Sequence, residues 1–176
     1  MTRFNLFAVL AIVPLIVTVV LQFFYIEELN TTNINLKHRV LLYEHFDTYS
    51  VEYMPDSIRQ LAHAMLFVES SGNDTVIQRN TKATGCMQIR TIMVDEVNRI
   101  CELNRYDIRF GYGDRFNRRA SLTMFSIWYQ HHHAHSTLQK IARNWNGGPT
   151  GYKANNTINY WLKVRKRMRR TNYRVV

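Results

Sequence analysis

The residue whose type and position most suggest chemistry is Glu69, which stands at the end of an apolar helical pattern. The apolar residues that recur at helical spacing before it are Ile58, Leu61, Ala62, Met65, Leu66 and Val68. A carboxylate in such a place is costly unless its charge is paired or its pKa is raised. A raised pKa suits a general acid, which must hold its proton near neutral pH. By itself, however, a glutamate at a helix end is more often a solvent-exposed surface residue.

Four sequence blocks, the first of which begins at Glu69, change this assessment. They are Glu69-Ser70-Ser71-Gly72-Asn73, Ala83-Thr84-Gly85-Cys86-Met87-Gln88-Ile89, Asn144-Trp145-Asn146-Gly147-Gly148 and Thr157-x-x-Tyr160-Trp161-x-Lys163-Val164. In order and spacing they resemble the soluble lytic transglycosylase domain, a lysozyme-like family that cleaves peptidoglycan glycan strands. The resemblance covers residues 55–164, and four blocks in order are far more specific than any one of them.

The resemblance implies roles for individual residues. Glu69 would be the catalytic acid and base, and the residues that would bind the substrate are Ser70, Met87, Gln88, Trp145, Asn146 and Tyr160. Tyr160 matches a tyrosine whose hydroxyl approaches the catalytic carboxyl. Two positions depart from the family pattern: Cys86 replaces the usual leucine, and Trp145 replaces a tyrosine, which removes a hydroxyl and offers a larger stacking face. The segment between positions 73 and 83 lacks the family's spacing, so no residue is carried over from it.

The number of carboxylates fits the chemistry of that family. A conventional glycosidase uses two carboxyl groups, but no second acid has a comparable place in the four blocks; the nearest are Asp74, Asp95 and Glu96, and the last two are expected to be solvated. The resemblance implies that Glu69 protonates the bond between N-acetylmuramic acid and N-acetylglucosamine. The acetamido group of the substrate would stabilise the cationic centre, and Glu69 would then accept the proton of the C6 hydroxyl. The product would be a 1,6-anhydro sugar, with no cofactor and no metal.

Two alternatives stay open at this point. The same fold could carry a muramidase that hydrolyses the bond with water. The chain could instead be a structural membrane protein of a virion that binds glycan without cutting it. Phage infection, phage release and secretion or conjugation all need local opening of the cell wall, and the Trp-Asn-Gly-Gly-Pro sequence at 145–149 is more similar to phage-type members.

The elements that must position these residues are mainly helical. We expect a domain like that of goose-type lysozyme, with a short β-hairpin at 74–84. The predicted helices are 36–46, 55–69, 86–103, 119–132, 137–146 and 157–169. The expected organisation is a membrane anchor at 1–28, a linker with an accessory helix at 29–54, a catalytic domain at 55–165 and a basic tail at 166–176.

An amino-terminal membrane helix is the next expectation. Residues 6–26 are almost wholly apolar and long enough to span a bilayer. No Ala-x-Ala cleavage site follows, which favours an uncleaved anchor over a signal peptide. Arg3 precedes the run, and Glu27 and Glu28 follow it, which favours a cytoplasmic amino terminus. We therefore expect a single-pass membrane protein with a periplasmic or otherwise extracytoplasmic catalytic domain, or a virion membrane protein if a phage encodes it.

The formal net charge of +10 indicates an anionic partner. A cell-wall polymer, anionic lipid and nucleic acid each carry such charge, and an outward-facing domain makes nucleic acid the least suitable. The carboxyl-terminal region is especially basic and could hold an anionic surface. Its cations are Lys163, Arg165, Lys166, Arg167, Arg169 and Arg170.

Neither a disulfide between the two cysteines nor a metal site at the histidine cluster is expected. If Cys86 and Cys101 share one helix, a rise of 1.5 Å per residue separates them by roughly 20 Å, too far for a disulfide. Both are therefore expected to be buried thiols. His131 and His135 lie one helical turn apart, as zinc ligands can, but no Cys, Asp or Glu stands close in sequence. A polar helix end is favoured over a metal site.

Overall fold

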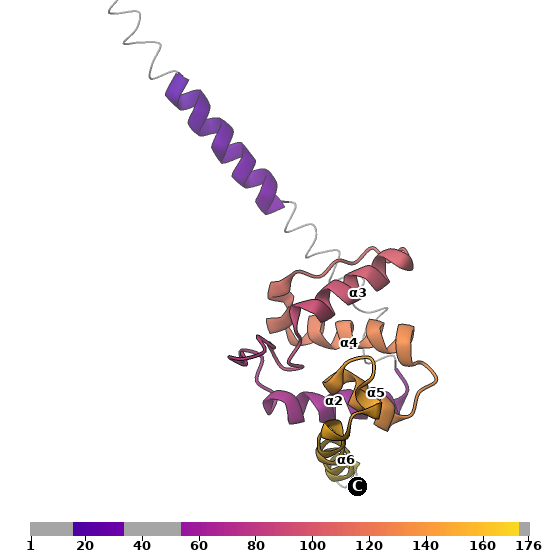
Figure 1. The fold of residues 1–176 in the computed structure, drawn as a ribbon. Helices are drawn as coiled ribbons and strands as arrows, with labels where there is room; N and C mark the ends of the chain where they lie inside the picture. Colours follow the sequence, from indigo (N-terminus) through magenta and orange to yellow (C-terminus); the bar gives the residue numbers. More distant parts are fainter. Residues whose placement is uncertain (1–15, 34–53, 173–176) are drawn as a thin grey trace, which may run out of the picture. The chain divides into compact units, whose positions relative to one another are not determined.

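The computed structural model describes two parts of the chain, residues 16–33 and 54–172. The chain divides into two compact units, Met1–Leu42 and Tyr43–Val176. In the first unit, residues 16–33 form one helix, which is drawn in indigo in Figure 1.

The expectation of a membrane anchor is corrected by this helix. No helix among residues 16–33 and 54–172 is long and apolar enough to cross a membrane. The largely apolar part of the helix, 16–26, is only about 16 Å long at 1.5 Å per residue, whereas a bilayer core is about 30 Å thick. Glu27 and Glu28 follow it within the same helix. The first part of the expected span, residues 6–15, lies outside the described residues. The prediction of a single-pass membrane protein that contacts lipid through residues 6–26 was therefore wrong for the helix that the structure describes.

The second unit is mainly helical, as predicted (Figure 1). Its α-helices are α2 (Asp56–Ser70), α3 (Thr91–Leu103), α4 (Arg118–His133), α5 (Leu138–Gly147) and α6 (Ile158–Asn172). Three short 3-10 helices connect them: η2 (Tyr112–Phe116), η3 (Gly151–Lys153) and η4 (Asn155–Thr157). The predicted accessory helix at 36–46 and the last residues of the basic tail, 173–176, lie outside the described residues.

Helix α2 carries the apolar face that the sequence predicts. Its buried residues are Ile58, Leu61, Ala62, Ala64, Met65 and Leu66. Burying each large side chain contributes about 1.5–3 kcal/mol, so replacing the fully buried Leu61 by alanine should cost about 2–5 kcal/mol. The helix ends where Ser71 adopts the left-handed conformation with φ +56°. Glu69 is thereby fixed in the last turn of the helix.

Helix α4 runs through the core of the unit. Its residues from Ala120 to Tyr129 are all buried, and the Asn117 side chain caps its beginning by accepting a hydrogen bond from the Ala120 N–H at 3.1 Å. Phe125 packs edge-on against Trp145 of α5, with ring centroids 5.4 Å apart. Helix α3 packs on α4, and α6 packs on both α2 and α5. The aromatic core therefore supports the carboxyl end of α5, and the beginning of α6 is held near the end of α2.

The segment between α2 and α3 differs most from its prediction. The expected hairpin is present only as two isolated bridges, Ile77 to Thr84 and Thr84 to Ile89, and the described residues contain no sheet. The helix expected to begin at Cys86 begins at Thr91 instead, because a turn with positive φ at Gly85 and Gln88 precedes it. Cys86 therefore does not share a helix with Cys101. Both thiols are nevertheless buried, as predicted, and both are free.

Candidate active site

Glu69 opens onto a cleft of about 680 Å³. The walls of the cleft come from the end of α2, the segment 76–90, the beginning of α3 and the end of α5. Burial raises the pKa of the Glu69 carboxyl from 4.5 to about 7, although the nearby Tyr160 hydroxyl acts in the opposite direction. Near neutral pH, Glu69 is therefore divided between its protonated and ionised forms. Such a group can give up a proton and take one back.

Tyr160 lies in the first turn of α6, behind Glu69. The Tyr160 hydroxyl is buried. In the described part of the chain, it is the one buried polar side-chain group that forms no hydrogen bond of regular geometry. The hydroxyl is nevertheless close enough to Glu69 for the two groups to affect each other's pKa: burial, and then the Glu69 carboxylate, raises the pKa of Tyr160 well above its ordinary value. The packing of α6 on α2 thus brings together the two residues that the resemblance pairs.

The block at 85–88 forms a tight turn in the cleft wall. Gly85 has φ +77°, and a Cβ at this position would lie 1.7 Å from the Arg115 carbonyl oxygen, so no other residue fits without moving the backbone. Gln88 lines the cleft and itself has φ +48°. Its amide group donates to the Gly85 carbonyl at 2.9 Å. The Gln88 side chain is therefore held by its own turn.

Trp145 and Asn146 form the opposite wall, at the end of α5. The Trp145 ring is largely buried, and it packs edge-on against Trp128 with centroids 5.1 Å apart. Its indole N–H donates to the Met87 carbonyl at 3.4 Å, which links the two walls. Asn146 is exposed to the cleft. Next to it, a Cβ at Gly147 would lie 2.6 Å from a methyl group of Thr157, so glycine permits close packing here.

Three of the predicted substrate-binding residues, Ser70, Met87 and Tyr160, do not line the cleft. Met87 is fully buried, and its backbone carbonyl is the part that supports Trp145. The Ser70 hydroxyl donates to the Leu66 carbonyl at 3.3 Å and accepts from the Gly72 N–H at 3.1 Å. Ser70 therefore closes the end of α2. Of the predicted set, Glu69, Gln88, Trp145 and Asn146 share the cleft, and Tyr160 lies behind Glu69.

Two arginines attach the wall segment 72–90 to the rest of the unit. Arg115 of η2 donates to the carbonyl oxygens of Lys82 at 3.2 Å and Ile89 at 3.3 Å. Arg118 at the beginning of α4 forms an ion pair with Asp74 at 3.1 Å. Because the described residues of this segment lack a sheet, these side chains, together with the close contact at Gly85, fix its position.

The sequence interpretation missed part of the cleft wall. Val76, Gln78 and Thr81 line it from the segment for which no family match was found. Arg90 lines it at the start of α3, and Glu69 and Arg90 are the charged residues that line the cleft in the described structure. Arg90 directly follows the sequence block at 83–89, and this position was the available signal that it lies close to the site.

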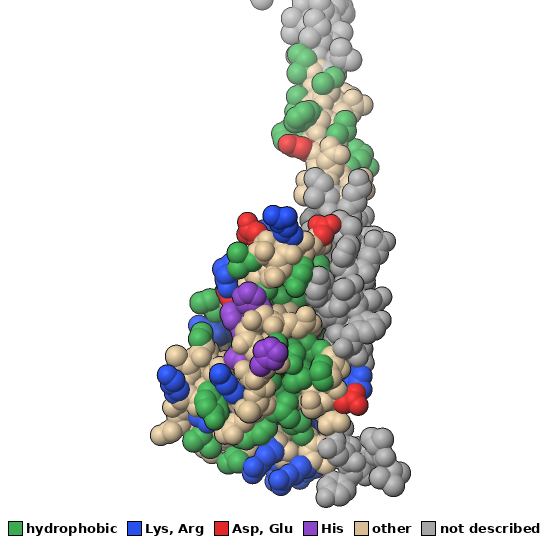
Figure 2. Space-filling view, turned by 90° about the vertical axis from the view of Figure 1, so that its right-hand side faces the viewer, with side chains coloured by type: hydrophobic (Ala, Val, Ile, Leu, Met, Phe, Trp, Pro, Cys, Tyr) green, Lys and Arg blue, Asp and Glu red, His purple; other side chains and the backbone are tan. Residues whose placement is uncertain are grey.

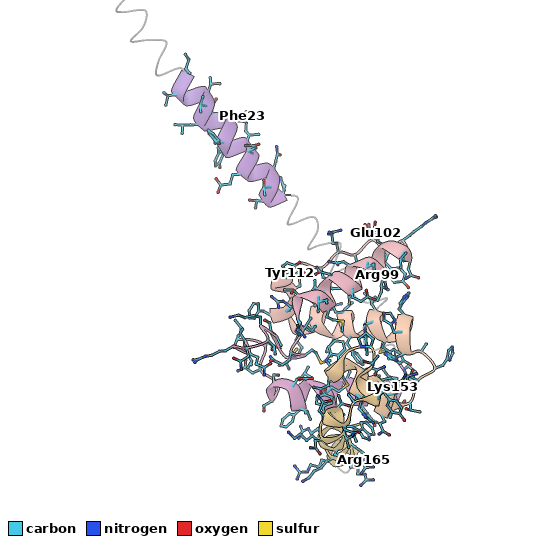
Figure 3. All side chains as sticks on the ribbon, in the orientation of Figure 1. Phe23, Arg99, Glu102, Tyr112, Lys153 and Arg165 are labelled. Atoms are coloured by element: carbon cyan, nitrogen blue, oxygen red, sulfur yellow. The ribbon has the colours of Figure 1, made fainter. Side chains whose placement is uncertain are left out.

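The other acidic residues that were weighed as partners of Glu69 lie outside the cleft. Glu96 is partly buried and pairs with Arg99 and with His132, both at 2.7 Å. These contacts, chiefly the one with Arg99, lower the pKa of Glu96 to about 2, so Glu96 is paired rather than simply solvated as predicted. The Tyr112 hydroxyl donates to Asp95 at 3.0 Å; Figure 3 labels Arg99 and Tyr112 at the α3 side of the unit. No described acid stands opposite Glu69 in the cleft.

The histidines gather at the end of α4, and Figure 2 shows them on one face of the unit. His133 is buried against Trp128, with ring centroids 4.5 Å apart, and is close to the Ser136 hydroxyl at 3.1 Å. Burial, followed by the nearby charges of His132 and Lys140, lowers the pKa of His133 to about 4. No group of three or more His, Cys, Asp or Glu residues in the described ranges could hold a metal ion.

Comparisons with protein-family models, with curated proteins and with solved structures find no match to this chain. The function is therefore argued from the geometry of the cleft and from the sequence blocks.

Proposed function

We propose that this chain is a lysozyme-like lytic transglycosylase that cleaves peptidoglycan glycan strands, with Glu69 as its acid and base. The observation that carries the proposal is that Glu69 is the one described acid in a cleft of about 680 Å³ and has a pKa raised to about 7. A cleft of this volume is in the range of ligand sites that bury most of a small molecule. It has room for a short stretch of sugars.

A single carboxyl group with this pKa suits a reaction in which the proton leaves and returns. Protonated Glu69 gives its proton to the glycosidic oxygen, and the bond between that oxygen and C1 of N-acetylmuramic acid breaks. The acetamido group of the same sugar stabilises the positive charge at C1. The C6 hydroxyl oxygen then bonds to C1, and its proton passes to the Glu69 carboxylate. The products are a 1,6-anhydro end and a free 4-hydroxyl on the leaving sugar, and Glu69 is protonated again.

The surrounding residues support this assignment in distinct ways. Gln88 and Asn146 supply amide groups on opposite walls of the cleft. Tyr160 stabilises the ionised form of Glu69, because its hydroxyl lowers the carboxyl pKa. A conventional glycosidase would place a second carboxyl group within about 5–10 Å of the first, and the described cleft wall offers none.

The proposal is tested by digesting purified sacculi with the full-length protein and analysing the products by mass spectrometry. Anhydro ends, each lighter by one water than a reducing end, are expected. Reducing ends would identify a muramidase instead, and the absence of any cleavage would leave only glycan binding. Glu69→Gln should lower the rate at least about 100-fold, as loss of a general acid does. The matched control is Glu102→Gln, an exposed acid of α3 labelled in Figure 3, which should retain activity.

A further inference from the structure

Helix α6 has a strongly basic exposed side. Its sequence at 163–170 is KVRKRMRR, and the helix contains no Asp or Glu. Tyr160 and Val164 are buried, so the opposite side of the helix is the one in contact with solvent. Figure 3 labels Arg165 of this helix at the end of the unit opposite to Glu102. A hollow of about 380 Å³ on this side is lined by Leu162, Arg165, Lys166, Arg169 and Arg170. These five residues form the basic face of α6.

The four cations of the basic face form no ion pair with the residues that the structure describes. Arg165 and Arg169 stand one helical turn apart, as do Lys166 and Arg170, and like charges at this spacing destabilise a helix. The helix dipole favours cations only in the last turn, so it does not offset the repulsion at Arg165 and Lys166. An anionic surface bound to the basic face would remove this cost.

Packing on the other side of α6 fixes the direction of the basic face. The central carbon of the Arg167 guanidinium lies 3.6 Å from the centroid of the Phe67 ring in α2. Such a cation over an aromatic ring is an attractive contact, and α6 also packs on α5. Arg167 is therefore used within the fold, whereas the cations of the basic face are presented to a partner.

Two exposed aliphatic side chains distinguish between the possible anionic partners. Leu162 lies among the cations and Ile158 stands one turn before it, and the two residues are 44% and 38% exposed. In a complex with nucleic acid, cations contact phosphates and sugars, and an aliphatic side chain beside them gains little. A bilayer offers headgroup phosphates to the cations and acyl chains to the aliphatic side chains. The combination therefore favours a lipid surface.

We propose that the basic face of α6 binds the phosphate headgroups of an anionic phospholipid bilayer, with Leu162 and Ile158 reaching the acyl chains beneath them. The contact lies at the surface of the bilayer and does not span it. Binding of this kind requires neither Glu69 nor a glycan strand. The inference therefore goes beyond the proposed function, and it is tested without any measurement of cleavage.

The test measures how the full-length protein partitions onto two kinds of sedimented vesicles. One kind is phosphatidylcholine alone, and the other is phosphatidylcholine and phosphatidylglycerol in equal parts. Binding through apolar residues elsewhere in the chain does not depend on headgroup charge, so the ratio of the two partition coefficients reports the contribution of the cations. Each cation near an anionic bilayer contributes about fivefold, so the wild type should favour the anionic vesicles more than about 100-fold.

Removing two cations of the basic face should lower this ratio about 20-fold, and the variant for this purpose is Arg165→Gln with Arg169→Gln. The matched control, Arg105→Gln with Arg109→Gln, removes two exposed arginines outside the basic face and should change the ratio less than about twofold. The Tm of the α6 variant should not fall, because the substitutions relieve repulsion within the helix. Unfolding would then not explain its weaker binding.

Leu162→Asn separates a bilayer from a hydrophilic polyanion. It should lower partition onto the anionic vesicles about tenfold, because an aliphatic contact with the acyl chains is lost. Leu103→Asn replaces an exposed leucine of α3 and should leave the partition unchanged. Equal partition of the wild type onto neutral and anionic vesicles would overturn the inference. An unchanged partition in Leu162→Asn would overturn it as well, and tighter binding of a short DNA duplex than of the vesicles would then identify nucleic acid as the partner.

Discussion

Relative to the wild type, glutamine in place of Glu69 should stabilise the folded protein more at pH 8 than at pH 4.5. The pKa of the Glu69 carboxyl is raised from its ordinary 4.5 to about 7, chiefly by burial, so the folded state holds the proton more tightly than the unfolded chain does. The contribution of Glu69 to the free energy of unfolding is therefore highest below pH 4.5, falls as the pH rises to about 7, and is constant above that. A glutamine amide does not titrate and avoids this loss.

The size of the effect follows from the displacement of the pKa. At 1.36 kcal/mol for each tenfold change in proton affinity, a pKa that moves from 4.5 to about 7 corresponds to about 3 kcal/mol. Urea unfolding of the wild type and of Glu69→Gln at pH 4.5 and pH 8 gives the difference in unfolding free energy at each pH. That difference should move by about 3 kcal/mol in favour of the variant, or roughly 10 °C in Tm for a unit of this size. Other titrating groups are present in both proteins and cancel.

Glu102→Gln serves as the control for this comparison, because Glu102 is exposed on α3. Its difference from the wild type should change by less than about 0.5 kcal/mol over the same pH range. If the Glu69→Gln difference also stays within about 0.5 kcal/mol between the two pH values, Glu69 titrates alike in the folded and unfolded states. The assignment of a half-protonated carboxyl at neutral pH would then be refuted.

Three further outcomes are expected. Tyr160→Phe removes the hydroxyl that lowers the Glu69 pKa, so the basic limb of the pH–rate profile for glycan cleavage should move to higher pH; an unmoved limb would contradict the contact. Gly85→Ala should cost more than about 2 kcal/mol in urea unfolding, because the added Cβ would lie 1.7 Å from a carbonyl oxygen, whereas Gly113→Ala, with open space around it, should cost far less. Burial, followed by the nearby charges of His132 and Lys140, lowers the pKa of His133 from 6.5 to about 4. The contribution of His133 to the free energy of unfolding, about 3 kcal/mol, should therefore be present above pH 6.5 and lost as the pH falls to 4. His133→Gln should not show this loss. If the free energies of unfolding of the wild type and of His133→Gln changed in parallel with pH, the lowered pKa of His133 would be contradicted.

The sequence predicted the parts of the fold that depend on local patterns. The apolar spacing before Glu69 correctly predicted α2, because one face of a helix must be buried for the helix to be stable. The helix ends near Gly72 and Gly148 were also close to those observed, since glycine tolerates the positive φ that follows a helix. Such signals depend on a few neighbouring residues. They can be read without knowing what the helix packs against.

The errors arose where distant contacts decide the structure. The segment 74–84, where a hairpin was expected, is instead held by Arg115 and Arg118. These arginines follow the segment by some thirty residues or more, so no local sequence pattern predicts the contacts. The membrane helix was inferred from the continuous apolar run at 6–26, whereas the described helix extends past this run to the polar residues at 27–33. Residues 6–15 of that run lie outside the described structure.

The sequence interpretation grouped four residues of the candidate site but missed part of its geometry. Glu69, Gln88, Trp145 and Asn146 were expected together, and they do line one cleft. The burial of Met87 was not foreseen, because a motif gives the order of residues and not the direction in which each side chain points. Here the Met87 side chain is fully buried, and its carbonyl oxygen accepts the hydrogen bond from the Trp145 indole.

The attachment of the wall segment 72–90 by arginines has a consequence for proteolysis. The ion pair between Arg118 and Asp74 is largely exposed, and such pairs weaken as dissolved salt screens their charges, whereas the aromatic packing of α4 and α5 does not. Concentrated salt should therefore loosen one wall of the cleft before any helix unfolds. A protease added at increasing salt concentration should first cut between residues 72 and 90, leaving two fragments that remain folded together.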